Sequence, residues 1–157
     1  MQPTVSDSAN NIATSGRNRL LFGLIAVLSL AGIIVSAISL QRHYARSATQ
    51  FCDFSQRFSC DIVNRSEYSS IMGVPVAGIG VAGYALLLVF STFMKGRPET
   101  PNRLLGAAAA GLAFAFYLTY IEAHVLETWC ILCVISLAII SLITLLAAVV
   151  KVKSAKA

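Results

Sequence analysis

The chain has 157 residues, of which 57% are hydrophobic and only 12% are charged. Soluble domains carry about 25% charged residues, so this composition excludes an ordinary soluble fold and predicts an integral membrane protein. The net charge of +5 does not indicate a nucleic-acid partner, because an excess of Lys and Arg also flanks membrane helices on their cytoplasmic side.

The chain begins with a polar segment, residues 1–19, which we expect to be disordered because it offers little apolar surface to bury. Four apolar stretches follow, and each is close to the roughly 20 residues that a helix needs to cross a bilayer. They cover residues 20–40, 74–94, 104–121 and 130–150. The predicted fold class is therefore all-α, with a four-helix transmembrane bundle over residues 20–150 and a basic tail at 151–157.

The first apolar stretch has a second interpretation, as a cleaved signal sequence, because Arg17 and Arg19 precede it. Signal sequences have an apolar region of roughly 7–15 residues that ends in an Ala-x-Ala-like site. This stretch is longer and no such site follows it. We therefore expect the segment to be retained as a membrane helix.

The Lys and Arg residues are unevenly divided between the two sides of the predicted bundle. One side holds Arg17, Arg19, Lys95, Arg97, Arg103, Lys151, Lys153 and Lys156. The other side holds Arg42, Arg46, Arg57 and Arg65. Because cytoplasmic loops carry the excess of cations, we expect an inner (plasma) membrane protein with both termini in the cytoplasm. The connections 41–73 and 122–129 then face outward.

Four cysteines fall in or beside these outer connections. Cys52 and Cys60 lie in connection 41–73, and Cys130 and Cys133 form a Cys-Ile-Leu-Cys motif where the last apolar stretch begins. On a helix, this spacing puts the second pair on one face, within the distance that a disulfide accepts. The positive end of the helix dipole also favours the thiolate of the nearer cysteine. Two dithiols in one oxidising compartment can exchange disulfides, so the pattern predicts a redox relay.

Other roles for these cysteines remain open on the residues alone. Cys130 and Cys133 are also compatible with packing or with metal binding, since short Cys-x-x-Cys motifs occur both as redox dithiols and as metal ligands. Cys52 and Cys60 are compatible with a purely structural bridge. A non-enzymatic membrane protein that holds a soft metal through its thiolates is therefore an alternative, although we predict no metal site. His43 and His124 lie in no recognisable motif, and we assign neither a role.

Several motifs occur in an order that resembles the vitamin K epoxide reductase family. They are Cys52 and Cys60, Ser66 six residues later, a Gly73-Val74-Pro75 entry to the second helix, Gly80 and Tyr84 after this entry, and Cys130-Ile-Leu-Cys133. The resemblance covers about residues 18–150 and is strongest to bacterial members that stand alone. Such members act with a separate thioredoxin-fold, DsbA-like periplasmic protein.

The resemblance implies a role for each of these residues. Cys133 would reduce a quinone of the menaquinone, ubiquinone or phylloquinone type and close a disulfide with Cys130. The loop pair would regenerate Cys130 through a transient Cys60–Cys130 bridge, while Cys52 meets the external partner. Ser66 matches the hydroxyl that covers the quinone pocket, although a Ser in a polar loop also serves as a cap or turn residue.

The sequence also departs from the vertebrate members of this family. They place an Asn and a Tyr near the quinone oxygens where this chain has Val76 and Leu137, so a plain quinone suits the site better than an epoxide. Tyr117 is a candidate pocket wall, or else part of an interfacial aromatic belt. The expected function is a membrane thiol-disulfide oxidoreductase that reduces a quinone and supports disulfide formation. Vitamin K or epoxide reduction proper, and a thiol oxidase of another four-helix family, are the alternatives.

Overall fold

A computed structural model describes residues 5–44, 53–55, 58–94 and 97–156 of the chain. Its helices are α1 (Val5–Tyr44), α2 (Cys60–Arg65), the short 3-10 helix η1 (Glu67–Ser69), α3 (Val76–Thr92), α4 (Thr100–His124) and α5 (Ile131–Lys156). Its strands are β1 (Asp53–Ser55), β2 (Phe58–Ser59), β3 (Ser70–Ile71) and β4 (Val74–Pro75). Cys52, one of the predicted relay cysteines, lies outside the described residues.

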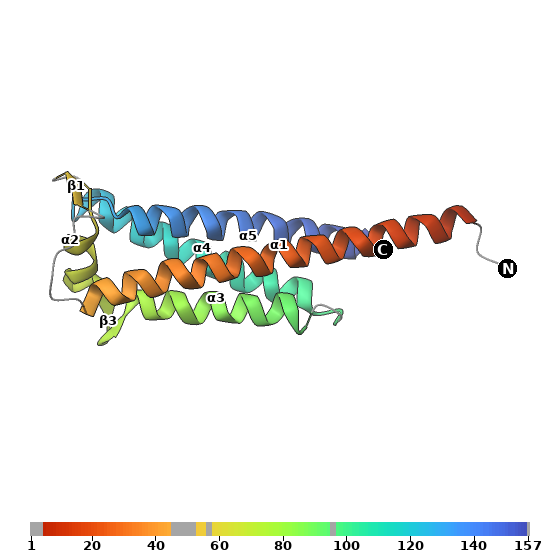
Figure 1. Ribbon diagram of the computed structural model, residues 1–157, viewed down its shortest axis with the longest axis horizontal. Helices are drawn as coiled ribbons and strands as arrows, with labels where there is room; N and C mark the ends of the chain where they lie inside the picture. The colour runs from red at the N-terminus through yellow and green to blue at the C-terminus, as the bar shows by residue number, and fades with distance from the viewer. Residues whose placement is uncertain (1–4, 45–52, 56–57, 95–96, 157) are drawn as a thin grey trace.

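Four helices, α1, α3, α4 and α5, run side by side along the long axis of the molecule, and the short elements gather at one end (Figure 1). Three of the helices are long and apolar enough to cross a membrane: Asn18–Tyr44 within α1, α4, and Ile131–Ala155 within α5. The fourth, α3, is apolar but shorter. The helical, membrane-type fold agrees with the composition, while four complete crossings remain a prediction.

The ends of the helices differ from the predicted bounds. Helix α1 begins at Val5, within the segment 1–19 that we expected to be disordered, and α5 continues to Lys156, through most of the predicted tail 151–157. Once a helix is nucleated, each further residue adds a hydrogen bond at little cost. Helical structure therefore continues beyond the apolar stretches that nucleate it. The length of an apolar stretch alone underestimates the length of the helix.

Helix α1 packs mainly against α3 and α5, and small residues allow the α1–α3 contact. A Cβ added at Gly32 would lie 2.4 Å from the ring of Tyr84 on α3. A Cβ at Gly80 would lie 2.9 Å from Oγ of Ser36 on α1. Small residues at such contacts are typical of membrane helices. The Tyr84 hydroxyl then reaches across to α5, where it lies 2.9 Å from both the carbonyl oxygen and Oγ of Ser136.

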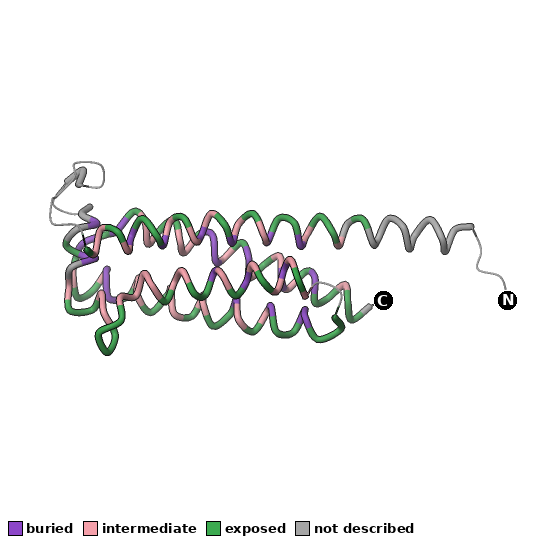
Figure 2. The backbone as a smooth tube through the Cα atoms, turned by 60° about the horizontal axis from the view of Figure 1, so that its bottom comes forward, coloured by how far each residue is buried: buried purple, intermediate pink, exposed green. Residues whose placement is uncertain are grey.

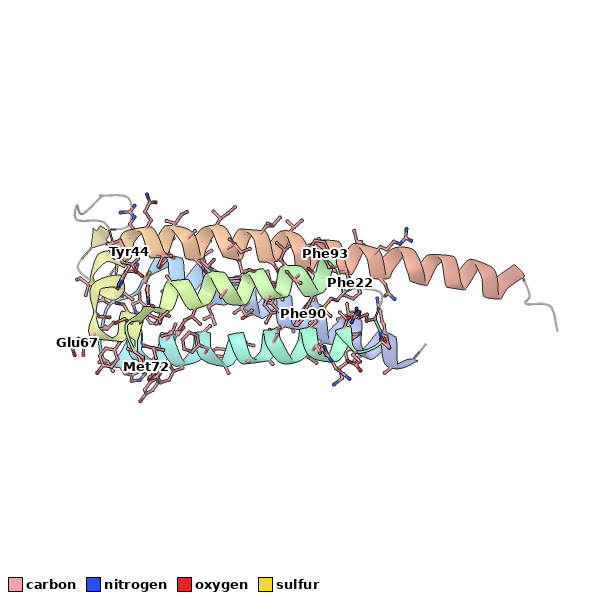
Figure 3. The ribbon with its side chains drawn as sticks, turned by 90° about the horizontal axis from the view of Figure 1, so that it is seen from below. Phe22, Tyr44, Glu67, Met72, Phe90 and Phe93 are labelled. Carbon is pink, nitrogen blue, oxygen red and sulfur yellow. The ribbon has the colours of Figure 1, made fainter. Side chains whose placement is uncertain are left out.

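Buried positions lie where the helices face one another, and exposed positions lie on the outside of the bundle (Figure 2). Many of the exposed positions carry large apolar side chains. The inner cluster includes Ile25, Leu104 and Ile143, and Phe22 and Phe90 pack at its far end (Figure 3). Exposed apolar side chains include Val27 and Leu145, each 64% exposed. An apolar surface of this extent is stable when lipid covers it, which agrees with a membrane location.

The end of the bundle with α2 also carries two small hairpins, β1–β2 and β3–β4. In the second hairpin, Ile71 pairs with Val74, and the two residues between them, Met72 and Gly73, have φ angles of 52° and 83°. Positive φ at both central positions defines the type I′ turn that suits a two-residue hairpin. Met72 is at the tip and points away from the bundle (Figure 3).

Candidate functional site

Helix α2 lies across the end of the bundle, where it contacts the last turns of α1 (Figure 1). The Ser39 hydroxyl on α1 donates to Oδ1 of Asn64 at 2.8 Å. Nδ1 of His43 lies 2.6 Å from the backbone oxygen of Asn64, to which it donates. Two polar contacts to one residue fix the position of α2, and with it that of Cys60, the first residue of this helix.

Cys60, Cys130 and Cys133 meet at this end of the bundle. Cys60 and Cys130 are each 0% exposed and share an apolar cluster with Val63, while Cys133 packs against it. The Cys130 side chain is in hydrogen-bonding contact with the side chains of both Cys60 and Cys133. The structure therefore brings together three of the four cysteines, with Cys130 between the other two.

The Cys130 thiol is less acidic than the helix dipole suggested. Its contact with Cys133, together with burial, raises its pKa, and the contact with Cys60 only partly offsets this. The backbone N–H of Val134 donates to the Cys130 oxygen at 3.0 Å, so Cys130 occupies the capping position at the start of α5. Burial and the neighbouring thiol dominate over the partial charge of the helix end, and Cys130 needs a base to become a nucleophile.

A cavity of about 340 Å³ opens beside Cys133, and all four long helices and α2 contribute to its walls. This volume is within the range of about 300–1,000 Å³ that is usual for small-molecule sites. Most of its wall is apolar, and Asn64 and Glu122 are among its polar residues. Cys133 lines the cavity, whereas Cys60 and Cys130 do not. The three sulfur atoms therefore form a chain of contacts from Cys60 through Cys130 to Cys133, and Cys133 is the one at the cavity.

The other predicted site residues divide into two groups. Ser66 and Val76 line the cavity, and the Ser66 hydroxyl donates to the Val63 oxygen at 2.8 Å. Leu137 and Tyr117 are not among the lining residues, and Tyr117 is 57% exposed on α4. Its exposure fits an aromatic belt at the membrane interface better than a pocket wall.

Asn64 lines the cavity and was not singled out from the sequence. Its side chain is 7% exposed, and its Nδ2 has no hydrogen-bond partner among the described residues. Buried donors nearly always have a partner, so an unsatisfied one beside a cavity indicates where an acceptor on a bound molecule would lie. Asn64 is four residues after Cys60, so on a helix the two residues share one face. This spacing was the sequence signal that could have identified Asn64 as a site residue.

Glu122 is the second residue that the sequence analysis missed, because we assigned it to the outer connection 122–129. In the structure it belongs to the last turn of α4, is 2% exposed and lines the cavity. Its Oε2 accepts a hydrogen bond from the backbone N–H of Cys130 at 3.2 Å, and its carboxyl group is in hydrogen-bonding contact with the Cys133 side chain. An acidic residue at the end of an apolar helix was the signal that could have identified it.

The connection between α4 and α5 is what brings Glu122 to the cysteines. The backbone N–H of Thr128 donates to the Glu122 oxygen at 3.2 Å, and Glu127 adopts a φ of 48°. These features fold the chain back tightly, so that the residues which end α4 face those which begin α5. Among the described residues, no group of three or more His, Cys, Asp or Glu side chains is arranged to hold a metal ion.

The sequence profile of the vitamin K epoxide reductase family matches residues 23–148, which is most of the chain. The chain belongs to the vitamin K epoxide reductase family. The match includes Cys60, Cys130, Cys133 and the helices that enclose the cavity. Vitamin K epoxide reductases are membrane redox enzymes that act on quinones and thiols, and membership therefore makes this protein a membrane oxidoreductase.

Proposed function

We propose that this protein oxidises a thioredoxin-fold partner at the outer face of the membrane and reduces a quinone bound in the cavity. The observation that carries the proposal is the order of the sulfur atoms: Cys60 contacts Cys130, Cys130 contacts Cys133, and Cys133 lines the cavity. Family membership supports the general chemistry.

The proposed relay proceeds by thiol-disulfide exchange. A Cys60 thiolate attacks the Cys130 sulfur of the Cys130–Cys133 disulfide, which forms a Cys60–Cys130 bridge and releases Cys133, whose thiolate takes up a proton and becomes a thiol. Cys52 then attacks Cys60, so that a Cys52–Cys60 disulfide forms and Cys130 is released. The loop disulfide oxidises the dithiol of the partner, and Cys130 and Cys133 pass two electrons to the quinone as their own disulfide closes again.

A lipid-soluble quinone of the menaquinone, ubiquinone or phylloquinone type suits a cavity with this apolar wall, because such molecules partition into the bilayer by apolar burial. Asn64 provides a hydrogen-bond donor for a quinone oxygen. The Ser66 hydroxyl already donates to the Val63 oxygen, so we assign it a supporting place in the wall. Val76 brings no polar group to the cavity, which favours a plain quinone over an epoxide as the substrate.

The proposed orientation puts both termini in the cytoplasm and the cysteine end of the bundle outside. The start of α1 and the end of α5 lie at the end of the bundle opposite to α2 (Figure 1). Arg19, Arg103 and Lys151 are on that side as well, in agreement with the positive-inside rule. Helix α3 then serves as the fourth crossing, since apolar stretches of about 17 residues still span thin regions of a bilayer.

The test is a Cys133→Ala variant in lipid nanodiscs, with a short-chain quinone as acceptor and a reduced thioredoxin-fold protein as donor. We expect quinone reduction to be lost, while mild oxidation converts Cys60 and Cys130 into a bridge that peptide mapping detects. Ile135→Ala, an exposed site on the same helix, is the control and should retain activity. Quinone turnover at the wild-type rate in Cys133→Ala would refute the assignment.

A further inference from the structure

Glu122 is an acidic residue held inside an apolar bundle, in contact with the sulfur atom that faces the cavity. It is 2% exposed and is the only carboxylate among the described residues that line the cavity. An ionisable side chain inside a membrane domain is costly to bury and is functional by default. The contact with Cys130 N–H at 3.2 Å holds only one of its two carboxyl oxygens, and its contact with the Cys133 side chain places it beside a group that must lose a proton.

We propose that Glu122 is a catalytic residue that carries a proton from the Cys133 thiol to an oxygen of the bound quinone. This inference rests on the proposed quinone reduction and assigns the proton path within it. Glu122 contacts the thiol on one side and the cavity on the other, which is the arrangement that a general acid–base group requires.

The proposed step balances in atoms and electrons. Cys130 and Cys133 together lose two electrons and two protons, and a sulfur–sulfur bond forms between them. The quinone gains two electrons and two protons and becomes a quinol. One proton passes from the Cys133 thiol to the Glu122 carboxylate and from there to a quinone oxygen, while the other comes from the Cys130 thiol. Glu122 finishes the cycle in the state in which it began.

The other ionisable groups around the cavity are less suited to this role. His43 on α1 directs its Nδ1 to the Asn64 oxygen, and the Tyr84 hydroxyl on α3 is bound to Ser136 on α5. Tyr68 of η1 lines the cavity but is half-exposed. Cys130, whose backbone N–H contacts Glu122, and Cys60, which contacts Cys130, are the remaining titratable groups near Cys133, and both belong to the relay.

The test compares Glu122→Gln with Glu122→Asp in the quinone-reduction assay. The glutamine keeps an oxygen acceptor for the Cys130 N–H but cannot carry a proton, so a merely structural role would survive this change. We expect the turnover number of Glu122→Gln to fall by about 100-fold or more, which is the usual contribution of general acid–base catalysis, with the KM for quinone within about twofold of wild type. Glu122→Asp keeps a carboxylate and should recover part of the lost rate.

A pH profile gives a second readout. Without an internal base, the thiol proton must leave to hydroxide, so the rate of Glu122→Gln should rise about tenfold per pH unit, more steeply than that of wild type. Glu127→Gln, at an exposed site in the adjacent connection, is the matched control and should behave as wild type. Thermal unfolding establishes that each variant is folded.

The outcomes separate this inference from the proposed function. If the wild-type protein reduces no quinone with thiol as donor, the proposed function fails. If wild type is active and Glu122→Gln has wild-type turnover and pH dependence, only the proton path is refuted. If Glu122→Asp is as inactive as Glu122→Gln and both unfold at lower temperature, the residue is structural and the proposal is also refuted.

Discussion

Replacing Asn64 by Leu is expected to stabilise the quinone-free protein and to weaken quinone binding. In the structure Nδ2 of Asn64 is buried without a partner among the described residues, and Oδ1 accepts one hydrogen bond from Ser39. A buried unsatisfied donor costs about 1–3 kcal/mol, whereas a typical hydrogen bond contributes about 0.5–1.5 kcal/mol. The Ser39 hydroxyl, which loses its acceptor, is free to donate to a carbonyl of its own helix. Removing the unsatisfied Nδ2 and losing the Ser39–Asn64 hydrogen bond should therefore raise the free energy of unfolding by about 1 kcal/mol.

The same substitution removes the proposed donor to the quinone oxygen. Loss of one hydrogen bond of about 0.5–1.5 kcal/mol corresponds to an increase of about 2-fold to 10-fold in the KM for quinone. The assay is steady-state quinone reduction in nanodiscs, together with thermal unfolding in the presence and absence of saturating quinone. Quinone should raise the unfolding temperature of wild type by more than that of Asn64→Leu.

Ser39→Ala is the matched control for Asn64→Leu. It removes the partner of Oδ1 and leaves Nδ2 in place, so it should destabilise the protein by about 1 kcal/mol and leave the KM for quinone within about twofold of wild type. A wild-type KM in Asn64→Leu would refute the donor assignment. A quinone-free Asn64→Leu protein that is less stable than wild type by more than about 2 kcal/mol would show that Nδ2 is satisfied in the folded chain.

Two further predictions concern helix packing and pH. Gly32→Ala should lower the free energy of unfolding by about 1–3 kcal/mol, as overpacking does, because the added Cβ would meet the Tyr84 ring. The control is Gly23→Ala, whose Cβ would have nothing within 4 Å and should have almost no effect. Thermal unfolding of the two variants measures the difference. Because the pKa of Cys130 is raised above the ordinary thiol value of about 9, the folded state binds more protons than the unfolded state above that pH. The free energy of unfolding should therefore fall as pH rises through about 9 and beyond, and Cys130→Ala should make this fall less steep. A Cys130 thiol that reacts with iodoacetamide at neutral pH as fast as a free thiol would contradict the raised pKa.

The positions of the long helices followed from the sequence, while their ends did not. Length and apolar composition locate α3, α4 and α5, because a helix in lipid must satisfy its own backbone and present apolar side chains. The extension of α1 to Val5 depends on helix propagation through polar residues, for which apolar length is no guide. The close approach of Gly32 to Tyr84 also required the structure, since it depends on which helix faces which.

The cysteines of the candidate site could be predicted from the sequence because cysteine is a rare residue. Cysteine is scarce, so the spacing of Cys130 and Cys133 and their position at a helix start indicated a redox pair. Asn64 and Glu122 are ordinary polar residues in the sequence, and their importance arises from burial beside a cavity between the helices. Tyr117 shows the reverse case: an aromatic residue near the expected pocket whose side chain lies on the exposed face of α4.

The complete burial of Cys60 and Cys130 has a kinetic consequence for any thiol or peroxide dissolved outside the membrane. Neither residue is exposed, so an outside molecule reaches either sulfur only after local opening, which the contacts of α2 with Ser39 and His43 oppose. The proposed exchange between these two buried sulfurs needs no such opening, because they are already neighbours. The fold thereby insulates this step from glutathione-like small molecules, so that the rate of leakage is set by local unfolding rather than by thiol concentration.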